Sequence, residues 1–285
     1  MSLTLLKNFR LVDENTDMSG SLILEGGIIK GILPGETDFP GGAGVRRELE
    51  RASAGAALVI DGLALCGGPP GSRRDGEDGG WKRRLPVLTP AFVDLHAHFR
   101  DPGFPEKETL ESGSLAAAAG GYGTVVCMAN TMPVTDTAEK ALALWRRAEA
   151  LGLIDLYPAL SLSMGMEGRE LSGIAALAPR EAGSGNSPGL YPPLLLSEDG
   201  KDVAEEALFS AAFAEARRLG IPVSCHCDAG GPPAEEAKKS GAPRSVWSAM
   251  EENAATRRAI EIGRRAGGRV HIAHVSTKEA AEAVR

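Results

Sequence analysis

The chain has 285 residues, of which 43% are hydrophobic and 24% charged, with a formal net charge of -7 and a pI near 5.4. This is a globular composition with enough apolar residues for a substantial core, and the acidic balance gives no basis for nucleic acid or an anionic membrane as a partner. No apolar run approaches the roughly 20 residues of a membrane span, no signal-peptide pattern opens the chain, and its four cysteines are typical of reduced thiols, so we expect a cytoplasmic protein.

Residues 1–88 predict a small β module rather than a βα repeat. Gly26-Gly27 is a hairpin signal between two strand-like segments, and residues 34–56 are polar and rich in glycine. Residues 67–84 have the composition of a disordered loop, and we interpret them as a flexible, solvated insertion although their five basic residues could form a docking patch. Strands are predicted over residues 3–6, 9–12, 21–24, 28–32 and 57–61.

The rest of the chain, residues 89–285, alternates between strands and helices. Alternating βα units imply a parallel sheet, and polar residues at the ends of several strands favour a TIM-type (β/α)8 barrel over a doubly wound sheet. A full barrel takes about 250 residues, so we expect about six units here and an incomplete barrel from a longer enzyme. Strands are predicted over 87–93, 124–129, 154–160, 189–196, 221–225 and 269–273, and helices over 108–119, 138–151, 168–177, 203–219, 249–266 and 277–285.

The five histidines lie at or near predicted strand ends. His96 and His98 are two residues apart, so in a strand they share a face and could hold one metal ion. Arg100 follows with a fork of donors that suits a carboxylate. His226 ends the fifth strand, and alternation turns Cys225 and Cys227 away from it, so we expect these thiols to be buried rather than metal ligands.

The segment PAFVDLHAHFRDPG, residues 90–103, resembles the first barrel strand of the dihydroorotases, a family of the amidohydrolase superfamily. Further stretches match that family in order: MANT (128–131) is similar to Met-Pro-Asn-Thr, SEDG (197–200) to Ser-Asp-Asp-Gly, CHCD (225–228) to His-Cys-Glu-Asp, and HIAHVSTK (271–278) to His-x-x-His-Val-Ser-Thr-Lys. The likeness runs from about Leu3 to the end with a poor fit over 34–84, and it implies that the N-terminal module is half of a β-sandwich built from both chain ends.

The resemblance implies a metal centre that holds one or two Zn²⁺ ions. Asp199 corresponds to the acid that bridges two metals, with Glu198 as second choice, and His271, three residues before His274, is interpreted as structural on the opposite strand face. The family's catalytic aspartate follows the eighth strand, which we expect beyond residue 285, so no catalytic residue is assigned here and residues 1–285 alone are expected to be inactive. The implied metal ligands are His96, His98, Asp199, His226 and His274.

Zinc chemistry of this kind suits hydrolysis of a cyclic amide. The resemblance implies the interconversion of dihydroorotate and N-carbamoyl-aspartate in pyrimidine biosynthesis, with His98, Arg100 and Asn130 as substrate-binding residues. Allantoinases and dihydropyrimidinases usually lack the arginine, and such a cyclic amidohydrolase is the first alternative. The second alternative is a non-catalytic homologue that serves as a structural partner. A homodimer, or a complex with aspartate transcarbamoylase, is the assembly that the resemblance suggests.

Overall fold

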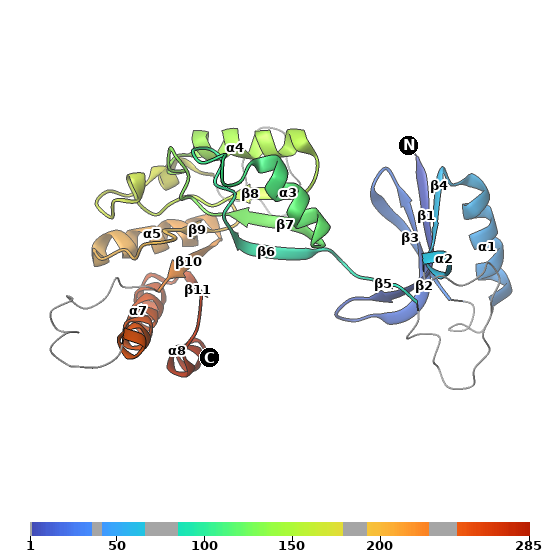
Figure 1. Ribbon diagram of the computed structural model, residues 1–285. Helices are drawn as coiled ribbons and strands as arrows, with labels where there is room; N and C mark the ends of the chain where they lie inside the picture. The colour runs from blue at the N-terminus through green and yellow to red at the C-terminus, as the bar shows by residue number, and fades with distance from the viewer. Residues whose placement is uncertain (1, 36–41, 66–84, 179–192, 228–243) are drawn as a thin grey trace. The chain divides into compact units, whose positions relative to one another are not determined.

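The computed structural model describes residues 2–35, 42–65, 85–178, 193–227 and 244–285. They form two compact units, Met1–Pro90 and Ala91–Arg285 (Figure 1). No helix within these described ranges is long and apolar enough to cross a membrane.

The first unit is built on one sheet with the strand order β3-β2-β1-β4, in which β5 also pairs with β1. Its elements are β1 (Leu3–Val12), β2 (Asp17–Glu25), β3 (Ile28–Pro34), α1 (Gly42–Gly55), β4 (Leu58–Asp61), α2 (Gly62–Leu65) and β5 (Val87–Leu88). The predicted hairpin is confirmed, because Gly26 and Gly27 take the left-handed φ values of 58° and 82° that join β2 to β3.

Three features in and next to this unit differ from the sequence analysis, and the first is that the strands predicted over 3–6 and 9–12 form the single strand β1. Helix α1 lies in the segment described only as polar and glycine-rich, where the run of arginine, glutamate and leucine has good helix propensity. Residues 87–93 were predicted as one strand, but they divide into β5 and β6 (Phe92–Ala97) because Pro90 has no N–H to continue a ladder. Strand β4 runs parallel to β1, so the module is not purely antiparallel.

The second unit contains two parallel three-stranded sheets that follow each other in chain order. The orders are β6-β7-β8 and β9-β10-β11, and a parallel bridge from Leu160 to Leu196 joins β8 to β9. The strands are β6, β7 (Tyr122–Cys127), β8 (Asp155–Pro158), β9 (Leu196–Ser197), β10 (Pro222–His226) and β11 (Arg269–Ala273). This order brings the carboxyl ends of all six strands to one edge.

The helices of this unit pack against the outer face of the strands (Figure 1). The largest core cluster lies between α5, α7 and the second sheet, and Phe209, Phe213 and Val223 are at most 2% exposed there. Arg258 of α7 donates to the carbonyl oxygens of Val203 and Ala204 at 2.7 and 2.8 Å, which fixes the segment after β9. The helices are α3 (Leu110–Ala119), α4 (Ala138–Leu151), α5 (Glu206–Leu219), α7 (Arg244–Ala266) and α8 (Lys278–Val284), with short 3-10 turns η1 (Met164–Met166) and η2 (Gly173–Ala176).

The predicted bounds of α4 and β11 agree with the structure, whereas the fourth strand and the weak helix do not. Within the described residues β9 is only Leu196–Ser197, and residues 189–192 of the predicted strand lie outside them, as does the interpreted insertion at 67–84. The helix predicted over 168–177 reduces to the short turn η2. Two glycines within the predicted range, at 168 and 173, make a longer helix unfavourable.

Candidate metal centre

Strand β6 delivers the first two histidines to the carboxyl edge of the sheet. The strand ends at Ala97, and the His96 N–H donates to the Asp94 carboxylate at 2.9 Å, which fixes the backbone at this end. His96 and His98 flank Ala97, and their rings meet edge to face with centroids 5.3 Å apart. The two imidazole rings therefore lie side by side at the end of β6, as their spacing in the sequence predicts.

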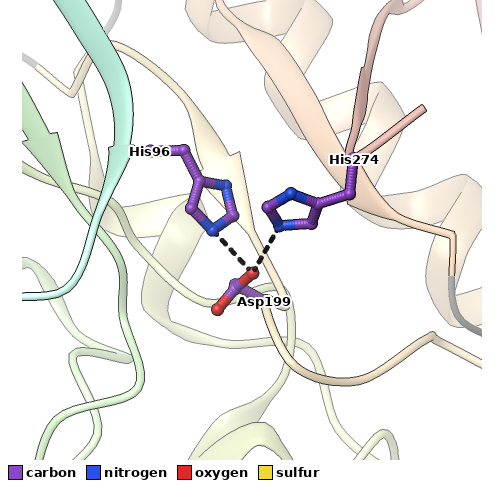
Figure 2. Close-up of side chains that lie close together, drawn as sticks. All are labelled: His96, Asp199 and His274. Atoms are coloured by element: carbon purple, nitrogen blue, oxygen red, sulfur yellow. Dashed lines mark ion pairs between the residues drawn. The ribbon is translucent and has the colours of Figure 1, made fainter. Parts of the chain in front are cut away.

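Asp199 lies in the turn after β9, and it is the point on which four histidines converge. Its carboxylate is only 3% exposed. The Nε2 atoms of His96 and His98 lie 2.9 and 3.4 Å from its oxygens, and those of His226 and His274 both lie 3.9 Å away. Figure 2 shows His96 and His274 pointing from opposite sides toward Asp199.

The last two histidines come from β10 and from the residue that follows β11. His226 is the final residue of β10, and His274 takes a left-handed backbone with φ 57° directly after β11. Left-handed backbone is uncommon outside glycine, and here it accompanies the turn of the His274 ring toward the others. Its ring centroid lies 4.5 Å from that of His96 and 5.1 Å from that of His226.

The surroundings of the cluster favour an ionised Asp199 and a neutral His274. Burial raises the pKa of Asp199, but the proximity of His96 and the charges of His98 and His226 outweigh burial, so the net pKa lies below its ordinary value. Burial, followed by the positive charges of His96 and His226, lowers the pKa of His274. An ionised carboxylate and a neutral imidazole are the forms in which these two side chains bind a metal.

The donor set fits a divalent metal ion. One ligand atom each from His96, Asp199 and His274 lies within 4.8 Å of the others. Nδ1 of His96 and Nδ1 of His226 are buried and have no hydrogen-bond partner in the described part of the chain, whereas Nε2 of His96 faces the Asp199 carboxylate at 2.9 Å. An unpartnered imidazole nitrogen is costly unless a ligand satisfies it. Imidazole nitrogens with one carboxylate are typical ligands of Zn²⁺.

Asn130 links the first sheet to Asp199. Its side-chain oxygen lies 3.0 Å from Nδ1 of His98, and its amide nitrogen donates to Oδ2 of Asp199 at 3.1 Å. In this arrangement the His98 Nδ1 atom carries the proton and leaves Nε2 free to bind a metal. The sequence analysis assigned Asn130 only to substrate binding. It did not predict that Asn130 hydrogen-bonds to two predicted metal ligands, His98 and Asp199.

Arg100 lies in the turn after β6, not on the strand face shared by its histidines. It takes a left-handed backbone with φ 59°, and its carbonyl oxygen accepts from the N–H of Phe104 at 2.8 Å. The following Asp101 accepts hydrogen bonds from Arg147 and from the N–H of Leu110 and so holds this turn. Among the described residues no ion pair engages the half-buried Arg100 guanidinium.

Glu198, the second choice for the bridging acid, does not face the histidines. Its carboxylate turns toward Leu162 and Ser163 and accepts their N–H groups at 2.8 and 3.1 Å. Burial raises the pKa of the Glu198 carboxyl, and these donors offset only part of that effect. The aspartate of this acidic pair is therefore the residue that reaches the cluster, as the sequence comparison favoured.

The expected position of His271 on the face opposite the metal centre is wrong. His271 is paired with Ser224, two residues before His226, and the flanking Val270 and Ile272 pack on the helical core. Alternation therefore places His271 on the face of His226. The inference failed because His274 takes a left-handed backbone directly after β11, so the alternation of side chains along a strand does not extend to it.

The cysteine interpretation agrees with the structure for the described residues. Cys127, Cys225 and Cys227 are buried free thiols, and Cys66 lies outside the described ranges. Burial raises the pKa of Cys127 to about 12 and that of Cys227 to about 11, which keeps them protonated. Cys225 and Cys227, which flank His226, belong to the hydrophobic core cluster that packs against the helices. Of these three consecutive residues, only His226 lies near Asp199.

Comparison with known proteins finds relatives of this chain among the dihydroorotases. The chain is 38% identical to the dihydroorotase of Thermus aquaticus over 214 residues, which are 70% of this chain and 46% of that protein. It is 36% identical to the dihydroorotase of Mycobacterium tuberculosis over 200 residues, which are 67% of this chain and 43% of that protein. The chain thus spans about half the length of the curated relatives it matches.

The fold is similar to that of solved hydantoinases. The L-hydantoinase (dihydropyrimidinase) from Arthrobacter aurescens aligns with 99% of this chain and 55% of its own, with a TM-score of 0.63 and 19% identity. This likeness confirms the mixed α/β class of the fold. The sequence profile described as dihydro-orotase-like matches residues 86–280, more than half of the chain, so the chain belongs to the dihydro-orotase-like family.

Proposed function

We propose that the protein is a zinc-dependent dihydroorotase that interconverts dihydroorotate and N-carbamoyl-aspartate in pyrimidine biosynthesis. The observation that carries this proposal is the convergence of four histidine Nε2 atoms within 4 Å of the Asp199 carboxylate. Family membership supports the choice of reaction. The proposal also includes a cytoplasmic location, as in the sequence analysis.

In this proposal Asp199 and the histidines at positions 96, 98, 226 and 274 would together hold one or two zinc ions. Bound zinc lowers the pKa of a coordinated water toward neutrality and polarises a carbonyl group. Asn130 fixes the proton of His98 on Nδ1, which directs Nε2 toward the metal. The buried Asp199 carboxylate compensates the positive charge in a site of low dielectric.

Substrate choice is proposed to rest on His98, Arg100 and Asn130. A guanidinium without an ion-pair partner in the described residues has donors available for the carboxylate of dihydroorotate. The hydantoinase fold favours one second candidate, hydrolysis of a cyclic amide that carries no carboxylate. A non-catalytic role has no observation in its favour, since the metal histidines are present and converge.

We propose that the second unit supplies six βα units of the (β/α)8 barrel and that the first unit contributes to a β-sandwich. The strands from β6 to β11 are parallel and neighbour one another in chain order, with the bridge between Leu160 and Leu196 joining the two sheets. This arrangement supports the barrel. Within the described residues β6 and β11 each pair on one side only. A homodimer or a complex with aspartate transcarbamoylase remains the assembly proposed from the resemblance.

The test is the steady-state kinetics of Arg100→Met on dihydroorotate in the protein extended through the two further βα units that the family resemblance implies, with metal content measured in parallel. Loss of a bidentate carboxylate contact is expected to lower kcat/KM by roughly 30- to 1000-fold with metal retained. Arg169→Met, which removes an arginine that is 84% exposed, is the matched control and should keep the wild-type value. Near-native kcat/KM in Arg100→Met would remove this arginine from the site, and turnover of hydantoin or allantoin in place of dihydroorotate would favour the second candidate.

A further inference from the structure

Glu198 is a buried carboxylate beside the metal centre that no step of the proposed function uses. It is 3% exposed, like its neighbour Asp199, but the two side chains make different contacts. Asp199 meets the histidines, whereas Glu198 accepts the N–H groups of Leu162 and Ser163 and the hydroxyl of Ser163. Three donors on one carboxylate satisfy a group that would be costly to bury alone.

The partner segment is itself firmly held. The Ser163 hydroxyl accepts from the N–H of Gly168 at 2.8 Å, and Ser163 is fully buried. From the other side, the ammonium of Lys201 donates to the Met166 carbonyl oxygen at 2.6 Å, and the Lys201 N–H donates to the Glu198 carbonyl oxygen at 2.9 Å. The turn 198–201 is thus attached to the segment 162–168 at both of its ends.

We propose that Glu198 is a positioning residue of the metal centre, which sets the direction of the Asp199 carboxylate by locking the turn 198–201 onto Leu162 and Ser163. The proposal rests on the proposed function, since it assumes that Asp199 binds metal. Glu198 and Asp199 are neighbours in this turn, so hydrogen bonds that hold Glu198 on Leu162 and Ser163 also restrict the backbone that carries Asp199. Glu198 therefore acts on the metal through Asp199 and touches neither metal nor substrate.

The length of the side chain matters to this role. The similar family motif has aspartate here, and the glutamate of this chain reaches one methylene further, about 1.5 Å. If the side chain were shortened, the 2.8 and 3.1 Å contacts could not both persist unless the turn moved toward Leu162. That movement would carry Asp199 away from the histidines, so Glu198→Asp should disturb the metal site although the charge is kept.

The experiment measures Zn²⁺ dissociation constants and the visible spectrum of the Co²⁺-loaded protein for the wild type, Glu198→Asp and Glu198→Gln. Loss of a group that orients a metal ligand typically weakens metal binding by about 10- to 100-fold. We expect that loss in both variants, with shifted Co²⁺ bands in Glu198→Asp. Thermal midpoints are measured on the same samples without metal, and they report the purely structural part of each substitution.

Asp136→Asn is the matched control, because Asp136 is 4% exposed and holds the same segment through the N–H of Gly165 at 2.9 Å. Neither of its chain neighbours is a proposed ligand, so this variant should lose thermal stability but keep the wild-type Zn²⁺ affinity within about twofold. Wild-type Zn²⁺ affinity in Glu198→Asp, or an equal loss in Asp136→Asn, would overturn the positioning role alone. Failure of the wild type to bind Zn²⁺ would instead overturn the proposed metal centre and with it this inference.

Discussion

The two halves of the second unit place their metal-site residues in different ways. In the half formed by β6, β7 and β8, His96 and His98 come from the end of a single strand, where simple alternation brings both rings to one side. In the half formed by β9, β10 and β11, Asp199 and His274 lie in turns beyond their strands. A strand end is held by its ladder, whereas a turn needs its own anchors.

Buried or half-buried carboxylates provide these anchors in the second half. Glu198 holds the turn that contains Asp199, and Glu252 of α7 holds the segment that follows His274. The Glu252 carboxylate accepts the N–H groups of Ser276 and Thr277 at 2.6 and 3.1 Å, as well as the Ser276 hydroxyl. From this comparison we expect metal binding here to depend on acids that are not themselves ligands.

The largest effect is expected where the halves meet, at Asp199. Asp199→Ala removes the oxygens that face all four histidines and leaves their rings close together without a counter-charge. We expect Zn²⁺ affinity to fall by more than about 100-fold. This loss exceeds the one expected when a residue that only orients a metal ligand is replaced. Isothermal titration with Zn²⁺ measures this, with the exposed Asp155→Asn as control, and an affinity within tenfold of wild type would contradict the convergence of the halves on this residue.

A smaller effect is expected from the anchor of the second half. Glu252→Gln replaces an oxygen that accepts N–H groups with an amide, which loosens the segment after His274 and should weaken Zn²⁺ binding by about tenfold. Glu261→Gln, on the same helix in an exposed ion pair with Arg264, should leave affinity unchanged. Competition of each variant with a chromophoric chelator gives the affinities, and equal values would show that the turn holds His274 without this acid.

The smallest effect concerns pH. Burial raises the pKa of Glu252, but the hydrogen bonds from Ser276 and Thr277 outweigh it and leave the folded pKa below the ordinary value of 4.5. A depressed folded pKa gives stability that is present above about 4.5 and is lost as pH falls through the folded value. The Tm of the wild type should therefore exceed that of Glu252→Gln at pH 7, and the two should converge in acid. A difference in Tm that grows as pH falls would contradict the direction of this shift.

The sequence alone predicted most of the framework, because strong periodicity survives in the structure. Residues 138–151 and 269–273 form their predicted helix and strand, and the histidine pair at 96 and 98 follows alternation. Prediction failed at the face of His271, because the backbone at His274 leaves regular strand geometry with a left-handed φ. The contact of Glu198 with Ser163 spans 35 residues, and no local pattern encodes such a pairing.

The central claim is that His96, His98, Asp199, His226 and His274 together form one metal centre. The most direct test is crystallographic anomalous scattering at the zinc edge on protein grown with Zn²⁺, with His98→Ala collected in the same way. The account predicts anomalous density between the histidine Nε2 atoms and the Asp199 carboxylate in the wild type, and density that is lost or sharply reduced in the variant. No zinc at this position in the wild type, or undiminished zinc in His98→Ala, would contradict it.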